Sequence, residues 1–175
     1  MKTKDMITTS LLLAMGLVLH TIVPGVLGMK FDLLLTFMFL AILINPSFKN
    51  MFLSGVTAGL LSALTTTFPA GQLPNIIDKI FTAFFVFLLI KFMKEKIGPT
   101  SRISIISFLG TIFSGVIFLT SALFLVRLPA PIEILIISVV LPTSFMNTFI
   151  SSIIFKSLYR IGPIRKIISS GNASS

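Results

Sequence analysis

The sequence predicts an all-α integral membrane protein with six transmembrane helices and both termini in the cytoplasm, organised as a single domain over residues 1–175. Two observations support this fold class. The chain is 55% hydrophobic with a mean hydropathy of +1.07, and its few charged residues separate six apolar segments. Because a helix needs ~20 mostly apolar residues to cross a bilayer, this composition favours a membrane protein over a soluble domain of the same length.

The apolar segments follow one another along almost the whole chain. They are Met6–Val23, Leu33–Phe48, Met51–Phe68, Pro74–Met93, Ile105–Val126 and Ile134–Tyr159. The first segment is longer than the apolar region of a typical secretory signal, and no Ala-x-Ala cleavage site follows it, so we interpret it as a membrane span. The chain is therefore expected to cross the membrane six times.

The basic residues are distributed unevenly between the two sides that these spans define. With the N-terminus inside, the outer side keeps only Lys30, Lys79 and Arg127. The inner side carries Lys2, Lys4, Lys49, Lys91, Lys94, Lys96, Arg102, Lys156, Arg160, Arg165 and Lys166. Because Lys and Arg in short loops set orientation, the sequence predicts a multi-pass inner-membrane protein with both termini cytoplasmic.

The same composition argues against several classes of function. The basic residues form no aromatic-interleaved stripe that could follow a phosphate backbone, so no nucleic-acid partner is expected. The chain has no Cys, a single His and no phosphate-binding Gly-x-x-x-x-Gly-Lys-Ser/Thr loop. We therefore expect no metal, no cofactor, no ATPase activity in this chain and no enzymatic reaction.

Each outer loop combines one basic and one acidic residue. The pairs are Lys30 with Asp32, Lys79 with Asp78, and Arg127 with Glu133. A surface of both signs suits a zwitterionic ligand such as a free amino acid, because its carboxylate needs a cation and its ammonium needs a carboxylate. The alternative is that these are ordinary surface pairs of little energetic value.

Asp78 is expected to lie inside the membrane. Only eleven residues separate Lys79 from Lys91, which is too short for a span, so the fourth helix must begin earlier, at Pro74. Asn75 and Thr82 then share one helix face with Asp78, and an ionisable residue at that depth is a functional candidate by default. Lys79 is expected to point elsewhere and to extend toward the surface.

Three further positions are candidates for ligand contact. The run Thr65–Lys79 contains two prolines, Gly71 and Gln72, and irregular backbone at membrane depth is tolerated only where protein or a cavity covers it. His20 lies near the outer end of the first helix, either as a ligand group or as a structural donor. Asn147 lies in the sixth span and is either an acceptor for a ligand N–H or a packing residue.

Small residues four positions apart allow helices to approach closely. Such pairs include Gly55 with Gly59, Gly110 with Ser114, Thr111 with Gly115, and Ser10 with Ala14. Most are expected to pack the bundle. Ser10 and Ala14 lie roughly opposite the His20 face of the first helix, so one face is expected to meet a partner protein while the other meets the ligand.

Four segments of the chain resemble the bacterial tryptophan-transport protein family, and the resemblance covers nearly the whole chain. They are LTTTFPAGQLPNIIDK at Leu64–Lys79, LGTIFSGVIFL at Leu109–Leu119, VVLPTSFMNT at Val139–Thr148 and GLVLHTIVP at Gly16–Pro24. FPAGQLPNIIDK is the most specific string.

The resemblance implies a substrate-binding S component of an energy-coupling factor transporter. Such a subunit captures its substrate, here tryptophan or a related indole, from outside. It docks on a transmembrane T component and two ATPase subunits through an Ala-x-x-x-Ala motif in the first helix. The matching positions here are Ser10 and Ala14, where serine departs from the motif but remains small. The absence of Trp among 175 residues supports a tryptophan transporter, and a codon bias toward Phe, Ile and Lys is the alternative explanation.

Two functions of other classes remain open. One is a self-sufficient secondary carrier driven by a proton gradient through His20 or Asp78. The other is a non-transporting accessory subunit that binds no small molecule. Six spans are few for a transporter built from inverted repeats, and the sequence contains no convincing internal repeat.

Overall fold

A computed structural model of the chain describes residues 3–22, 25–26, 29–30, 32–93 and 97–160. Five of the predicted inner-side charges fall outside these residues, namely Lys2, Lys94, Lys96, Arg165 and Lys166. The side chain of Lys30 also lies outside the described part of the chain, although its backbone belongs to a short strand.

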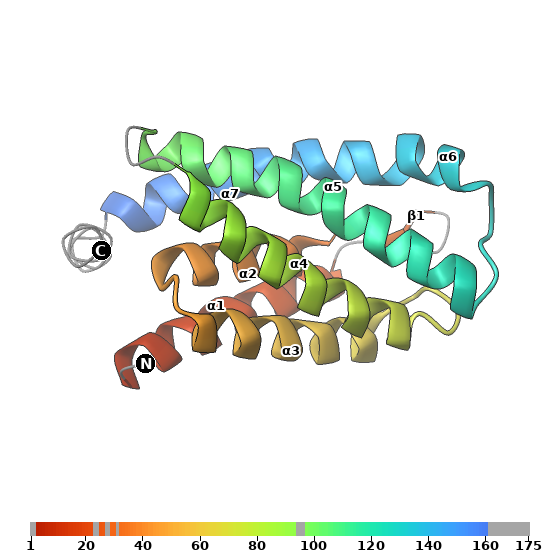
Figure 1. Cartoon of the computed structure of the whole chain (residues 1–175), viewed down its shortest axis with the longest axis horizontal. Coiled ribbons are helices and arrows are strands. Elements are labelled where there is room, and N and C mark those ends of the chain that lie inside the picture. The colour runs from red at the N-terminus through yellow and green to blue at the C-terminus, as the bar shows by residue number, and fades with distance from the viewer. Residues whose placement is uncertain (1–2, 23–24, 27–28, 31, 94–96, 161–175) are drawn as a thin grey trace.

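The described residues form a helical bundle (Figure 1), which confirms the all-α fold class. The elements are α1 (Thr3–Ile22), β1 (Gly25–Val26), β2 (Met29–Lys30), α2 (Leu33–Ile44), α3 (Phe48–Thr65), α4 (Gln72–Phe92), α5 (Pro99–Leu125), α6 (Ile132–Leu135), the π-helix η1 (Ile136–Val140) and α7 (Leu141–Arg160). The two strands form a small antiparallel hairpin between α1 and α2, with Gly25 opposite Lys30. A hairpin was not expected from the sequence.

Four helical stretches of the described chain are long and apolar enough to cross a membrane. They are Thr3–Ile22, Gln72–Phe92, Pro99–Leu125 and the continuous run Ile132–Arg160. The helix Leu33–Ile44 is apolar but shorter, and it ends well before the predicted boundary at Phe48. Pro46 explains the early end, because the residue before a proline disfavours helical geometry, and Ser47 then caps α3 by accepting a hydrogen bond from the Asn50 backbone N–H at 3.3 Å. Six spans therefore remain a prediction.

Helix α2 occupies the centre of the bundle (Figure 1), where it contacts α1, α3, α4, α5 and α7. Eleven of its twelve residues are buried. A helix that is apolar on every face is stable only inside a protein or a membrane, and here the neighbouring helices surround it. The central position brings the N-terminus of α2 into contact with several other helices.

Glycines let the helices around this centre approach closely, as the spacing of small residues predicts. A Cβ added to Gly55 would lie 2.8 Å from the Ala83 Cβ, and one added to Gly59 would lie 3.1 Å from the Ile76 Cα, so α3 packs nearly backbone to backbone on α4. A Cβ at Gly16 would lie 2.9 Å from Leu34 in α2.

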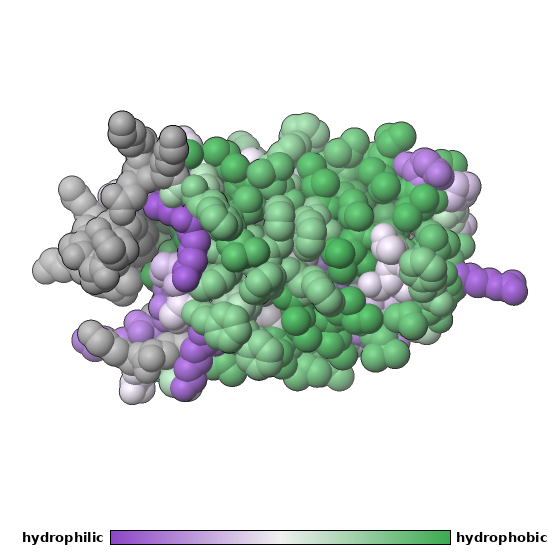
Figure 2. All heavy atoms as spheres, in the orientation of Figure 1, coloured by the Kyte–Doolittle hydropathy of each residue, from purple (hydrophilic) through white to green (hydrophobic). Residues whose placement is uncertain are grey.

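An apolar belt covers the side of the bundle, and hydrophilic residues gather at its two ends (Figure 2). This surface is that of a multi-pass membrane protein, because lipid accommodates exposed apolar side chains. Ser10 and Ala14 are exposed on α1, whereas Gly16 and His20 are buried, so the two faces of α1 differ as expected. The N-terminus of α1 and the C-terminus of α7 lie at the same end (Figure 1).

Candidate functional site

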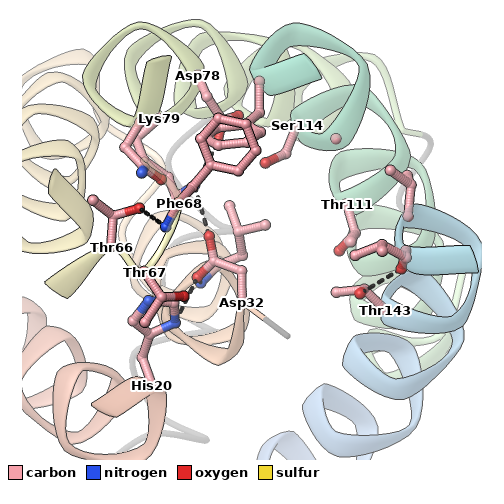
Figure 3. Close-up of a pocket in the computed structure, with 16 residues that line it drawn as sticks. His20, Asp32, Thr66, Thr67, Phe68, Asp78, Lys79, Thr111, Ser114 and Thr143 are labelled. Atoms are coloured by element: carbon pink, nitrogen blue, oxygen red, sulfur yellow. Dashed lines mark hydrogen bonds and ion pairs between the residues drawn. The ribbon is translucent and has the colours of Figure 1, made fainter. Parts of the chain in front are cut away.

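A pocket lies toward the end of the bundle opposite to Thr3 and Arg160, where α1 ends, α2 begins, and the loop joins α3 to α4 (Figure 3). The pocket has a volume of about 80 Å³. Its lining residues are His20, Asp32, Leu35, Thr66, Thr67, Phe68, Asn75, Asp78, Lys79, Thr111, Ser114, Gly115, Phe118, Val139, Val140 and Thr143. One side of the pocket is charged and another is apolar.

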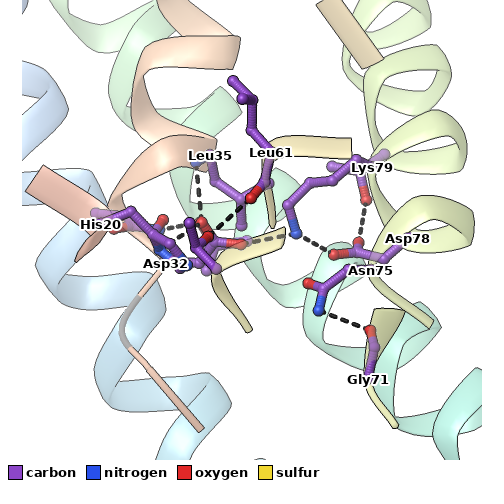
Figure 4. Close-up of polar contacts among 12 residues, drawn as sticks. His20, Asp32, Leu35, Leu61, Gly71, Asn75, Asp78 and Lys79 are labelled. Atoms are coloured by element: carbon purple, nitrogen blue, oxygen red, sulfur yellow. Dashed lines mark hydrogen bonds and ion pairs between the residues drawn. The ribbon is translucent and has the colours of Figure 1, made fainter. Parts of the chain in front are cut away.

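The charged side consists of two carboxylates that share one lysine (Figure 4). The Lys79 Nζ lies 2.7 Å from the Asp32 Oδ2 and also donates to the Asp78 Oδ2. The side chains of Lys79 and Asp78 are each 1% exposed, and that of Asp32 is 16% exposed. Buried charges persist only when they are paired and hydrogen-bonded, and the three groups meet this requirement for one another.

Local sequence explains how each carboxylate is held. Asp32 is the N-cap of α2, and its side chain accepts a hydrogen bond from the Leu35 backbone N–H at 3.3 Å. Asp78 accepts a hydrogen bond from the Thr82 hydroxyl at 2.9 Å, four residues further along α4. The expected polar stripe therefore exists, with Asn75, Asp78 and Thr82 all buried on α4.

The structure corrects the prediction for Lys79. We expected its side chain to point away from Asp78 and to extend toward the surface, but it is buried between Asp78 and Asp32. The close packing of α3 on α4 removes the exposed face that the prediction assumed, and the N-terminus of α2 supplies a second carboxylate. Asp32, which was grouped with Lys30 in the sequence, therefore pairs with Lys79 of another helix.

His20 completes this side of the pocket. Its ring is buried at the last turn of α1, and its Nδ1 lies 3.4 Å from the Asp32 Oδ1. Burial by itself raises the pKa of the Asp32 carboxyl, but the positive charge of Lys79, the neighbouring His20 and the hydrogen bond from Leu35 outweigh it and hold the pKa below its ordinary value. Asp32 is therefore an anion at neutral pH.

The apolar side is built from aromatic and branched residues. Phe68 and Phe118 meet edge to face, with their ring centroids 5.3 Å apart, and Leu35, Val139 and Val140 complete the wall. The two valines belong to the π-helix η1, a widened turn that occurs frequently at functional sites. A wall of this kind suits a flat apolar group such as an aromatic ring.

The remaining sequence candidates lie at different distances from the pocket. Asn75 lines it and donates to the Gly71 carbonyl at 2.8 Å, whereas Gln72 is exposed and is not a lining residue. Asn147 is fully buried behind the wall, where its Nδ2 donates to the Asp32 carbonyl at 3.1 Å and to the Thr111 hydroxyl at 3.2 Å. It connects α7 to two elements that line the pocket.

Several lining residues were not singled out as ligand contacts in the sequence. They come from α5 (Thr111, Ser114, Gly115, Phe118) and from the η1–α7 region (Val139, Val140, Thr143). Thr66, Thr67 and Phe68 also line the pocket and lie in the run Thr65–Lys79 that was expected to contact a ligand. The spacing of small residues in α5 was a usable signal, because it places them on one face, but it does not distinguish a pocket wall from helix packing. No comparable pattern in the sequence predicted the π-helix.

Fold and site together define a class of protein: a multi-pass helical membrane protein with an amphipathic pocket near one end. The chain belongs to the family described as "Tryptophan transporter TrpP", whose family model matches residues 2–161. This result confirms the family resemblance and places the chain among transporters and not among enzymes.

Curated relatives cover most of the chain. A probable tryptophan transport protein of Clostridium acetobutylicum is 47% identical over 156 residues, covering 89% of this chain and 91% of that protein. Proteins of the same description from Bacillus subtilis and Clostridium perfringens are 45% and 42% identical, covering 89% and 88% of this chain and 90% of each relative. No solved structure matches the chain.

Proposed function

We propose that this chain is a tryptophan-binding membrane subunit that takes up its substrate from the outside of a bacterial cell. The observation that carries the proposal is the pocket, which is lined by a charged cluster together with aromatic and aliphatic side chains, in a member of a tryptophan transporter family. A free aromatic amino acid needs both surfaces at once, because its backbone groups are charged and its side chain is largely apolar.

The pocket suggests a pose for the substrate. The indole ring lies against Phe68 and Phe118, and the amino acid backbone lies near Asp78 and Asp32. Thr143 donates its own hydroxyl proton to the Val139 carbonyl at 2.6 Å, so its oxygen keeps lone pairs for the indole N–H.

Further polar groups support this pose. The Thr111 hydroxyl accepts a hydrogen bond from Asn147 and keeps its own proton for a ligand oxygen. The Asn147 Oδ1 is buried with no hydrogen-bond partner among the described residues.

In this proposal, partner subunits and not this chain supply the energy for transport. The chain crosses the inner membrane six times with both termini cytoplasmic, as an S component that docks on a transmembrane T component carrying two ATPase subunits. Ser10 and Ala14 support the docking role, because they are exposed on the face of α1 that points away from the pocket residue His20.

The first test uses the composition of the chain. The protein contains no Trp, so purified chain in detergent gives no indole emission of its own, and added tryptophan reports directly on its environment. Saturable, blue-shifted emission on titration supports the proposal. A folded protein that binds no tryptophan over a wide concentration range contradicts it and favours the accessory-subunit reading.

A second test addresses the energy source. Vesicles that contain this chain alone are expected to bind tryptophan without accumulating it, and accumulation is expected only when the T component and both ATPases are present with ATP. Accumulation by the chain alone, abolished by an uncoupler, would instead establish the proton-driven carrier.

A further inference from the structure

The pocket contains two carboxyl groups that contact a single lysine. Among the described residues that line it, Asp32 and Asp78 are acidic, Lys79 is basic, and His20 is the one other titratable residue. Both carboxylates contact the same ammonium group. When both carboxylates are ionised and His20 is neutral, two anions share one cation and the cluster carries a net charge of −1.

Two of the three Lys79 donors are engaged by this arrangement. Its Nζ is held between the Asp32 Oδ2, at 2.7 Å, and the Asp78 Oδ2 (Figure 4), and its side chain is 1% exposed. An ammonium group has three donors, and two of them point at carboxylates. Lys79 is therefore a poor anchor for a ligand carboxylate, although the sequence suggested that role for it.

The two carboxylates, in contrast, can still accept hydrogen bonds from a ligand. Each can accept about four hydrogen bonds. Asp78 has partners in Lys79, Thr82 and Ser114, and Asp32 has partners in Lys79, Leu35 and the nearby His20. Both residues line the pocket. An unbalanced buried anion is costly unless a cation joins it, so the site is complementary to one more positive charge.

We infer that the ammonium group of the ligand is this missing cation, so that the pocket selects its ligands by their amino group and not by their carboxylate. The inference rests on the proposed function, since it takes the occupant of the pocket to be an indole amino acid. It extends the substrate class to indole amines and excludes indole acids that lack an amino group.

Three indole compounds test the inference with the purified wild-type chain. They are tryptophan, tryptamine, which has the ammonium alone, and indole-3-propanoate, which has the carboxylate alone. Titrations are run at about pH 8, where an unperturbed histidine is neutral. We expect the Kd of tryptamine to lie within about tenfold of that of tryptophan, and the Kd of indole-3-propanoate to be at least about 100-fold higher, as for a buried charge that loses its partner.

Variants that balance the cluster sharpen the test. Asp78→Asn removes the excess negative charge, so we expect it to weaken tryptamine binding and to strengthen indole-3-propanoate binding relative to wild type. A merely damaged pocket weakens both. Asp32→Asn provides a second neutral cluster should Asp78→Asn fail to fold. Glu133→Gln is the matched control, because this exposed carboxylate lies outside the pocket lining and its loss should change neither Kd.

The outcomes separate the inference from the proposed function. Tight binding of tryptophan and indole-3-propanoate without tryptamine overturns the inference and leaves the proposed function intact. Equal binding of all three compounds also overturns it, and assigns the missing charge to a proton or a solvent cation. Tryptamine binding without tryptophan binding supports the amino-group selection and contradicts tryptophan as the substrate.

Discussion

Lys79 is the residue on which the charged side of the pocket depends. It forms ion pairs with carboxylates from two separate elements, the N-terminus of α2 and the second turn of α4. Removing one partner of a buried charge pair is far more costly than replacing the whole pair with apolar groups, because the remaining charge is left without compensation. The lysine therefore holds the cluster together as well as shaping its charge.

Lys79→Met is expected to destabilise the protein by about 3–5 kcal/mol, since it leaves two buried carboxylates close together. The double variant Lys79→Met/Asp32→Asn should recover part of this loss, because only one carboxylate then remains charged. Thermal unfolding in a fixed detergent measures both effects. A double variant no more stable than Lys79→Met would show that the lysine acts through packing alone.

Asp32 makes the stability of the protein depend on pH in the acidic range. Its pKa is lower in the folded chain than its ordinary value of 3.8, so the folded state holds its proton less readily than the unfolded state. Its stabilising contribution is therefore fully present above about pH 4 and is lost as the pH falls through the lowered value. Asp32→Asn should flatten this part of a stability profile measured by thermal unfolding between about pH 3 and 7. A pH profile of stability that is the same in Asp32→Asn as in the wild type would contradict the assignment of this pH dependence to Asp32.

At the scale of elements, the approach of α3 to α4 decides where Lys79 can point. A Cβ at Gly55 would lie 3.2 Å from the Lys79 carbonyl and 2.8 Å from the Ala83 Cβ, so only glycine allows this distance between the helices. The contact closes the face of α4 that carries Lys79 and leaves its side chain to meet the N-terminus of α2. Helix packing thus sets the electrostatics of the site.

Gly55→Ala is expected to push α3 away from α4, to cost about 1–3 kcal/mol as overpacking does, and to weaken tryptophan binding because Lys79 moves. Gly98→Ala is the matched control, since nothing lies within 4 Å of the added Cβ. Unfolding temperature and tryptophan titration are measured on both variants. Equal unfolding temperatures and equal tryptophan affinities of the two variants would show that the α3–α4 distance does not affect the pocket.

At the scale of the whole molecule, the pocket lies at one end of an apolar bundle, and Thr3 and Arg160 lie at the opposite end. If the inner side carries the termini, as the distribution of Lys and Arg predicts, the pocket opens toward the outer half of the membrane. That orientation suits a protein that captures a substrate from outside.

The absence of Cys allows this orientation to be mapped with single cysteines on a silent background. Ala130→Cys lies between α5 and α6 at the pocket end, and Ser101→Cys lies in the first turn of α5 at the opposite end. A membrane-impermeant maleimide is expected to label Ala130→Cys in intact cells and Ser101→Cys only after permeabilisation. The reverse pattern would place both termini outside.

The sequence by itself determined the helical membrane class, because hydropathy and charge spacing act locally along the chain. It also determined the polar face of Asn75, Asp78 and Thr82, since helical periodicity places these residues together. Only the tertiary structure decided that Lys79 turns inward to Asp32, that α2 is buried on all sides, and that η1 forms part of the pocket wall. These features depend on contacts between segments far apart in sequence, and neither the distance between two charges nor the burial of a helix is encoded in any one of those segments.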